Sequence, residues 1–227
     1  MIGILLALQV NHWNEEKQNR KLEKEYLQKL VLEFDANKQS AEINLNYQQF
    51  LVDNAMLILT TISGDTVLQD AEALAVAIEH VGWTFYIDFI KDVWNELHST
   101  GNIRIIQNTE LRNALTDFYR TMEVYFNEER ECSSFNLGVR RLLGDVLDSQ
   151  TRLQFKDILA PCCYEGGLDP IPDLNEINHN LNQLSGLNGY LLDIVLGRRA
   201  TASILTSTIE QIDHIQDLLS GELNKLQ

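Results

Sequence analysis

The apolar residues of the first quarter of the chain recur every three to four positions. The series runs through Leu22, Tyr26, Leu30, Phe34, Ile43, Tyr47, Leu51, Ile58 and Ile62. This spacing places the side chains on one face of an α-helix. It predicts a long amphipathic helix over residues 14–62, either continuous or broken near Asn37, that ends at Ser63, Gly64 and Asp65.

The next segments combine a short helix with a dense aromatic run. A helix is expected over residues 69–80, which are rich in Ala, Leu and Val and precede Gly82. The run WTFYIDFI that follows has the composition of a short strand, but its continuation to His98 favours a helix. Five aromatic residues form a candidate pocket or interface, although packing into the core is the favoured interpretation: Trp83, Phe85, Tyr86, Phe89 and Trp94.

Two further long helices complete the pattern. Asn108 or Thr109 is suited to cap a helix that runs to about Leu147, and a closing helix is expected over residues 187–226. All three prolines lie between Pro161 and Pro172, which predicts an irregular loop at 160–173. Long helices with few loops bury their apolar faces against each other, so the predicted fold is all-α, a long-helix antiparallel bundle.

The first residues have the character of the end of a membrane helix. The run IGILLAL at positions 2–8 is apolar throughout, and Trp13 lies where an interfacial aromatic residue would lie, just before the charged stretch 15–24. A spanning helix needs about 20 apolar residues, which is about twice the length of this run. Two interpretations stay open: the end of a membrane helix over residues 1–13, followed by a helical bundle domain over 14–227, or a short helix packed on the protein's own core.

The net charge bears on which partners are expected, and the cysteines bear on whether disulfides are expected. The formal net charge of −15 makes the average surface repel phosphate backbones, so nucleic acid is not expected as a partner. The three cysteines, Cys132, Cys162 and Cys163, are too few for a disulfide framework. A bridge from Cys132 to one of the other two is the alternative to unpaired thiols.

The sequence shows no catalytic or cofactor-binding pattern above background, and neither a cofactor nor a metal is predicted. Glu176 and His179 have the E-x-x-H spacing of di-iron bundles, but no second such pair occurs in the chain. Cys162 and Cys163 are adjacent and lack the gap that would turn both thiolates toward one zinc ion. An enzyme is therefore not the expected class.

Three stretches resemble an uncharacterised family of Gram-negative bacterial proteins that have a single N-terminal membrane helix and an extracytoplasmic helical bundle. They are IGILLALQVNHWNEEKQNRKLEKEYLQKL at 2–30, NELHSTGNIRIIQNTELRNALTDFY at 95–119 and, more loosely, the closing helix around LNGYLLDI. The resemblance implies a longer membrane helix that begins upstream of Met1. It further implies an inner-membrane, single-pass location with the bundle on the extracytoplasmic side, or a cytoplasmic location if the short start is genuine.

These observations lead to two functional hypotheses. The first is a membrane-anchored helical bundle that acts as a scaffold, a partner-binding module or a sensory module, with the membrane and a protein partner or a second copy of itself as partners. The alternative is a soluble helical protein that binds a small apolar ligand between its helices, at the aromatic run from Trp83 to Trp94.

Overall fold

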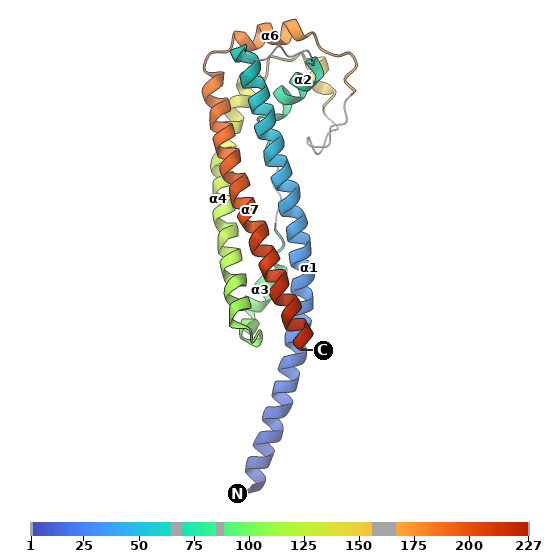
Figure 1. Ribbon diagram of the computed structural model, residues 1–227, viewed down its shortest axis with the longest axis vertical. Coiled ribbons are helices and arrows are strands. Elements are labelled where there is room, and N and C mark those ends of the chain that lie inside the picture. The colour runs from blue at the N-terminus through green and yellow to red at the C-terminus, as the bar shows by residue number, and fades with distance from the viewer. Residues whose placement is uncertain (1, 65–69, 85–88, 156–166, 227) are drawn as a thin grey trace. The chain divides into compact units, whose positions relative to one another are not determined.

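The computed structural model describes residues 2–64, 70–84, 89–155 and 167–226, with the side chains of residues 2–8 and 127–135 excepted. The elements in this part of the chain are helical, and it contains no strand (Figure 1). In chain order they are α1 (Ile2–Ser63), α2 (Ala71–His80), α3 (Asp92–Ser99), the 3₁₀ turn η1 (Asn102–Ile105), α4 (Thr109–Leu143), α5 (Ser149–Leu153), α6 (Leu174–Asn182) and α7 (Leu187–Lys225). The predicted all-α class is confirmed for these residues.

The chain divides into two compact units, and each of the long helices α1, α4 and α7 contributes to both. Unit 1 comprises Met1–Ala41, Asp88–Glu123 and Ser207–Gln227, and unit 2 comprises Glu42–Ile87 and Val124–Thr206. Each unit has buried residues of its own from all three long helices. The helices are therefore shared, but each unit has its own core.

Polar contacts define the helix directions within unit 1. Along α7 the partners of α1 run in reverse order, since Lys24 contacts the Leu226 carbonyl, Asp35 accepts a hydrogen bond from Gln216, and Lys38 pairs with Asp213. The predicted antiparallel packing thus holds for α1 and α7.

The same unit contains a parallel helix pair, which the sequence analysis did not predict. Glu23 accepts a hydrogen bond from the Gln107 amide just before α4, and ten residues later Glu33 accepts one from Tyr119 within α4. The partners of α1 therefore advance in the same direction along α4. This arrangement is possible because the chain returns from unit 2 to unit 1 before α4 begins.

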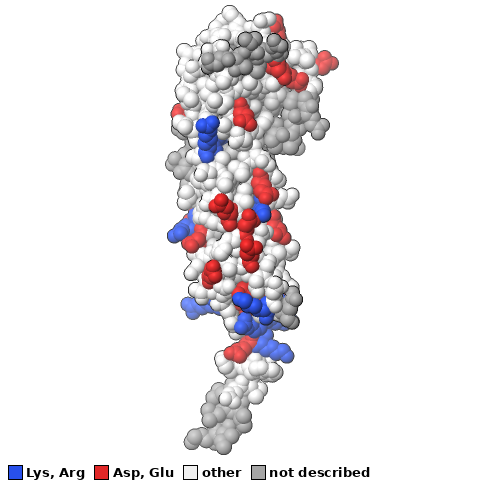
Figure 2. Space-filling model, viewed as in Figure 1, with Lys and Arg blue, Asp and Glu red and all other residues white. Residues whose placement is uncertain are grey.

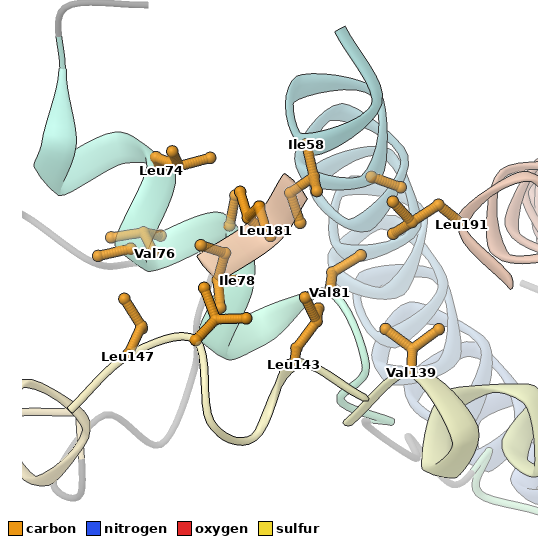
Figure 3. Packing of buried hydrophobic residues seen from close by; sticks show 14 of the residues in the cluster. Ile58, Leu74, Val76, Ile78, Val81, Val139, Leu143, Leu147, Leu181 and Leu191 are labelled. Atoms are coloured by element: carbon orange, nitrogen blue, oxygen red, sulfur yellow. The ribbon is translucent and has the colours of Figure 1, made fainter. Parts of the chain in front are cut away.

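Unit 2 has an apolar core to which five helices contribute. Ile58 of α1, Leu74 of α2, Leu143 of α4, Leu181 of α6 and Leu191 of α7 are all buried in one cluster (Figure 3). Burying such side chains stabilises each by about 1.5–3 kcal/mol relative to exposure. This burial holds the short helices α2 and α6 against the long ones.

Helix ends agree closely with the local signals in the sequence. Asn108 accepts a hydrogen bond from the Leu111 amide and so caps α4. Gly64 and Gly101, which follow α1 and α3, have φ angles of 75° and 73°, the left-handed conformation that suits glycine after a helix. The closing helix begins at Leu187, as predicted, and ends within one residue of the predicted end. In contrast, α4 ends at Leu143 rather than near Leu147.

The structure corrects the membrane prediction. No helix in the described part of the chain has an apolar stretch long enough to cross a bilayer. The apolar run at 2–8 belongs to α1, but that helix continues directly into polar residues from Gln9 onward, whereas a crossing needs about 20 apolar residues. The predicted membrane helix, membrane anchoring and inner-membrane, single-pass location are therefore wrong for the chain as described.

The alternative of a short N-terminal helix packed on the protein's own core is also not observed for the described side chains. Residues 9–21 of α1 are exposed, with Val10 at 60% and Trp13 at 64%. Figure 1 shows this part of α1 continuing past the C-terminal end of α7. It is a helical extension of unit 1, and α1 becomes part of the core only from Glu23 onward.

The helix predicted across the aromatic run is wrong for the described residues, since Trp83, Thr84, Phe89 and Ile90 lie outside regular secondary structure. A tertiary contact explains the difference at Ile90, because both of its backbone groups hydrogen-bond to the side chain of Asn37. The alternative break of α1 near Asn37 is likewise absent. Asn37 stays helical and is buried.

Candidate functional site

A groove lies between α4 and α7 in unit 1. Its volume is about 560 Å³. One wall is a stripe of α4 and the other is a stripe of α7, and both follow the helical repeat. The lining residues are Glu110, Asn113, Ala114 and Asp117 from α4, and Gln211, His214 and Ile215 from α7.

The groove forms because a small residue on α4 faces α7. Ala114 carries only a methyl group where larger side chains would fill the space between the helices, while Leu111 and Leu115 beside it are fully buried. Ile215 is also fully buried and forms the apolar floor together with Ala114. The groove therefore has an apolar floor with polar walls.

The rim of the groove is acidic and rich in hydrogen-bond acceptors. Glu110 lies 3.8 Å from His214 Nε2, and Asp117 pairs with Arg120 at 2.8 Å. Gln211 Oε1 is shielded from solvent and has no hydrogen-bond partner among the described residues. A buried acceptor in this state costs free energy unless a donor reaches it. The arrangement suits a ligand that carries an N–H donor or a positive charge.

Further carboxylates extend the acidic surface along α7. Glu210, Asp213 and Asp217 are exposed on this helix. Figure 2 shows carboxylates gathering over the surface where α7 lies in Figure 1. Lys38 neutralises Asp213 at 2.6 Å, but the acidic residues outnumber the basic ones on this part of unit 1.

Two of the five predicted aromatic site residues lie in an aromatic cluster of unit 1. Phe89 meets Phe118 edge-on with ring centroids 6.3 Å apart, and Trp94 stacks on Tyr119 at 4.6 Å. Phe34 of α1 lies 4.9 Å from Phe118 and completes the cluster. The rings contact one another directly, which is the packing of a core.

The remaining predicted site residues are divided between unit 2 and the undescribed part of the chain. Trp83 lies in unit 2, where Arg140 sits over its ring at 5.0 Å and His80 lies 5.8 Å from it. Phe85 and Tyr86 lie outside the described residues. Of the three described residues, Phe89 and Trp94 therefore belong to one aromatic cluster, and Trp83 has other contacts.

His80 occupies an apolar environment in unit 2. Its ring is fully buried and lies among Phe50, Trp83 and Phe155 at 5.2–6.1 Å. Burial lowers the pKa of His80 below 6.5, against smaller opposing effects of the Val76 carbonyl and Glu79. Nδ1 lies 2.9 Å from the Val76 carbonyl oxygen, so the neutral ring donates its proton there. His80 is thus a core residue that stays neutral near pH 7.

Glu33 and Tyr119 form a buried pair in unit 1. The Tyr119 hydroxyl donates to Glu33 at 2.5 Å, and the Val93 amide donates to the other carboxylate oxygen at 2.8 Å. Burial is the main cause that raises the pKa of Glu33 above 4.5, against these hydrogen bonds, which lower it. Burial and the nearby carboxylate also raise the pKa of Tyr119. No periodicity signal marks this pair, because Glu33 reads as an ordinary polar helix residue.

Unit 2 contains a network of buried polar side chains that the apolar pattern of the sequence did not reveal. Arg198 is only 1% exposed, and its Nη1 donates to Gln48 Oε1 at 3.1 Å. Gln48 in turn donates to Asn44, which donates to the Tyr125 hydroxyl. The sequence did contain a sign of this network. Asn44, Gln48 and Arg198 fall at helical spacing from apolar residues, on the faces of their helices that were expected to be buried.

The candidate metal ligands do not form a cluster in the described residues. Glu176 and His179 are exposed on α6, where His179 contacts Gln183 at 2.7 Å. No group of three or more His, Cys, Asp or Glu side chains suited to a metal occurs in the described ranges. Cys162 and Cys163 and the side chain of Cys132 lie outside them.

Comparison with known proteins finds no relative of this chain. No family model matches the chain, and no curated protein or solved structure matches it. The resemblance to a membrane-anchored bacterial family therefore stays a prediction.

Proposed function

We propose that this protein binds a small ligand between its helices, in the groove between α4 and α7 of unit 1. The observation that carries the proposal is the combination of an apolar floor, Ala114 and Ile215, with an acidic rim. Ligand sites commonly pair apolar walls with a few polar groups that orient the ligand. The ligand class that fits is a molecule with an apolar body and a protonated amine.

Each part of the groove has a defined task in this proposal. The apolar body of the ligand lies against Ala114 and Ile215 and is thereby removed from contact with water. The ammonium group lies near Glu110 or Asp117 and donates to the shielded Gln211 Oε1. Since both carboxylates are more than 60% exposed, each contributes only a modest amount to affinity.

The test is a titration of the protein with octylamine, and octanol is the uncharged comparison. Binding is measured by calorimetry and by the NMR chemical shifts of the amides in α4 and α7. Ala114→Leu fills the floor and is expected to abolish octylamine binding. Glu110→Gln should weaken binding by roughly two- to fivefold, the range of an exposed ion pair. Ala200→Leu, an exposed position of α7 in unit 2, is the matched control and should leave binding unchanged.

Two outcomes would reject the groove as the ligand site. In the first, Ala114→Leu binds octylamine as tightly as the wild type does. In the second, neither octylamine nor octanol shifts any amide of α4 or α7.

A second candidate function, docking of a protein partner, is favoured by the carboxylates along α7. A basic segment of a partner would complement Glu210, Asp213 and Asp217. A decalysine peptide is the probe. Its binding should weaken with salt and in the double variant Glu210→Gln, Asp217→Asn, but should survive Ala114→Leu. Binding of octylamine alone would favour the first function, and binding of the peptide alone would favour the second.

A further inference from the structure

Residues 89–107 form a strap that lies along one face of α1 in unit 1. The strap includes α3 and η1, both short, and connects to the start of α4. Four side chains of α1 hold it, and they recur at intervals of three, seven and four residues, so they share one helical face. These residues are Glu23, Tyr26, Glu33 and Asn37.

At both ends the strap is held by bonds from α1 side chains to its backbone. Asn37 donates to the Ile90 carbonyl at 2.8 Å and accepts from the Ile90 amide at 2.7 Å. Glu33 accepts from the Val93 amide in the first turn of α3, where amides lack a partner within the helix. Glu23 accepts from the Gln107 amide at 2.7 Å. The strap thus obtains from α1 hydrogen bonds that its own short elements cannot supply.

The middle of the strap is held by side-chain contacts. The Tyr26 hydroxyl donates to Glu96 and accepts from Asn102, both at 3.0 Å. Lys29 adds an exposed ion pair with Glu96 at 3.4 Å. Such exposed pairs contribute little free energy.

Beneath the strap lies an aromatic surface of α4. Phe89 and Trp94 of the strap cover Phe118 and Tyr119 of α4 at ring distances of 6.3 and 4.6 Å. The strap itself buries three apolar residues, Phe89, Leu97 and Ile106. The long helices, by contrast, bury apolar residues on successive turns.

This difference in burial makes detachment of the strap cost less free energy than separation of the long helices. Hydrogen bonds exchanged for bonds to water contribute only about 0.5–1.5 kcal/mol each, whereas each large buried apolar side chain contributes more. Segments with few buried apolar contacts open at lower free energy than core helices do. The strap can therefore detach at a cost that leaves the pairing of α1, α4 and α7 in place.

We propose that the strap, residues 89–107, is a lid that opens from α1 while the long helices of unit 1 stay paired, and that opening exposes the rings of Phe118 and Tyr119. This lid is separate from the groove between α4 and α7. Its opening depends on the four side chains of α1 that bond the strap. Asn37 matters most among them, because it makes two hydrogen bonds to Ile90.

Hydrogen exchange of the whole chain tests the lid. In the wild type, the amides of Val93, Asn95 and Thr100 should exchange at least tenfold faster, relative to their intrinsic rates, than buried amides near Leu115 in α4. Asn37→Ala removes both bonds to Ile90 and should accelerate the strap amides by roughly five- to thirtyfold, the change for about 1–2 kcal/mol. Amides of α4 should change little.

Asn46→Ala is the matched control, because Asn46 is an exposed residue of the same helix and the substitution has the same effect on helix propensity. It should leave the strap amides unchanged. The probe for the uncovered surface is 1-anilinonaphthalene-8-sulfonate, whose fluorescence should rise with Asn37→Ala and not with Asn46→Ala.

Three results would overturn the proposal. In the first, the strap amides of the wild-type protein exchange as slowly as the amides of α4; this measurement needs no variant protein. Asn37→Ala accelerates strap and α4 amides equally, which indicates global unfolding. The strap amides accelerate but the dye fluorescence stays at the wild-type value, which rejects the uncovered surface.

Discussion

At the scale of single residues, the informative feature is polar side chains buried along α1. Glu23, Glu33 and Asn37 are each less than 5% exposed, although a helix in a bundle usually buries apolar residues at such positions. Each of them bonds a backbone group of the strap. A buried polar group that has partners specifies which segment packs there, because a slipped register would leave it unpaired.

Glu33 gives a prediction with a definite sign. Burial raises its pKa above 4.5, so the ionised form is disfavoured in the folded state. Its contribution to the unfolding free energy is full below about pH 4.5 and is lost as pH rises through the raised folded pKa. Glu33→Gln lacks this titration, so its unfolding free energy relative to wild type should increase from pH 4.5 to pH 8 in urea denaturation followed by circular dichroism.

The control for this experiment is Glu210→Gln, an exposed glutamate of α7 in the same unit. Its difference from wild type should vary little with pH. A Glu33→Gln variant that differs from wild type by the same amount at every pH would contradict the assignment, because it would show that folding does not raise the pKa of Glu33.

At the scale of elements, the short helices depend on close approaches to the long ones. Gly82 follows α2, and a methyl group at its Cα would lie 2.3 Å from Arg140 Cγ and 2.9 Å from the Asn136 carbonyl oxygen on α4. The absence of a side chain therefore lets the chain after α2 contact α4 directly. The sequence marked Gly82 only as the end of a helix.

This close approach predicts opposite effects of two glycine substitutions within unit 2. Gly82→Ala should lower the unfolding free energy by roughly 1–3 kcal/mol, because backbone of α4 must move. Gly189→Ala in α7 meets nothing within 4 Å and should raise it by up to about 1 kcal/mol through helix propensity. Thermal denaturation of both variants is the measurement. Equal effects of the two substitutions would show that the contact with α4 carries no cost.

At the scale of the whole molecule, the dominant property is the net charge of −15. A protein with so many unbalanced carboxylates is destabilised by repulsion among them. The ion pairs between described residues are mostly exposed at one partner or both, so they offset only part of this repulsion. Salt screens exposed charges over about 10 Å at 0.1 M.

Salt is therefore expected to stabilise this protein. Raising NaCl from 20 to 300 mM at pH 7 should increase Tm by roughly 2–4 °C, the shift for about 1 kcal/mol in a chain of this length. Near pH 4.5, where many carboxylates are protonated, the same change in NaCl should have a smaller effect. A Tm that falls with salt at pH 7 would mean that attractive ion pairs outweigh the repulsion.

The sequence by itself determined the helical class and the ends of several helices. Apolar positions every three to four residues, Asn108 at an N-cap and Gly64 and Gly101 after helices act within a few residues of the chain, so local pattern suffices to find them. The same pattern could not tell a short apolar helix end from part of a membrane helix. That prediction was wrong because seven apolar residues are compatible with both.

Only the tertiary structure decided which segments meet. Asn37 and Ile90 lie 53 positions apart, and the groove joins residues of α4 and α7 that are about 100 positions apart. Helical periodicity states which face is buried but not what covers it, so neither the strap nor the groove was predicted. The aromatic run became two separate sets of contacts for the same reason: packing partners far along the chain, such as Phe118 for Phe89 and Arg140 for Trp83, determine where each ring lies.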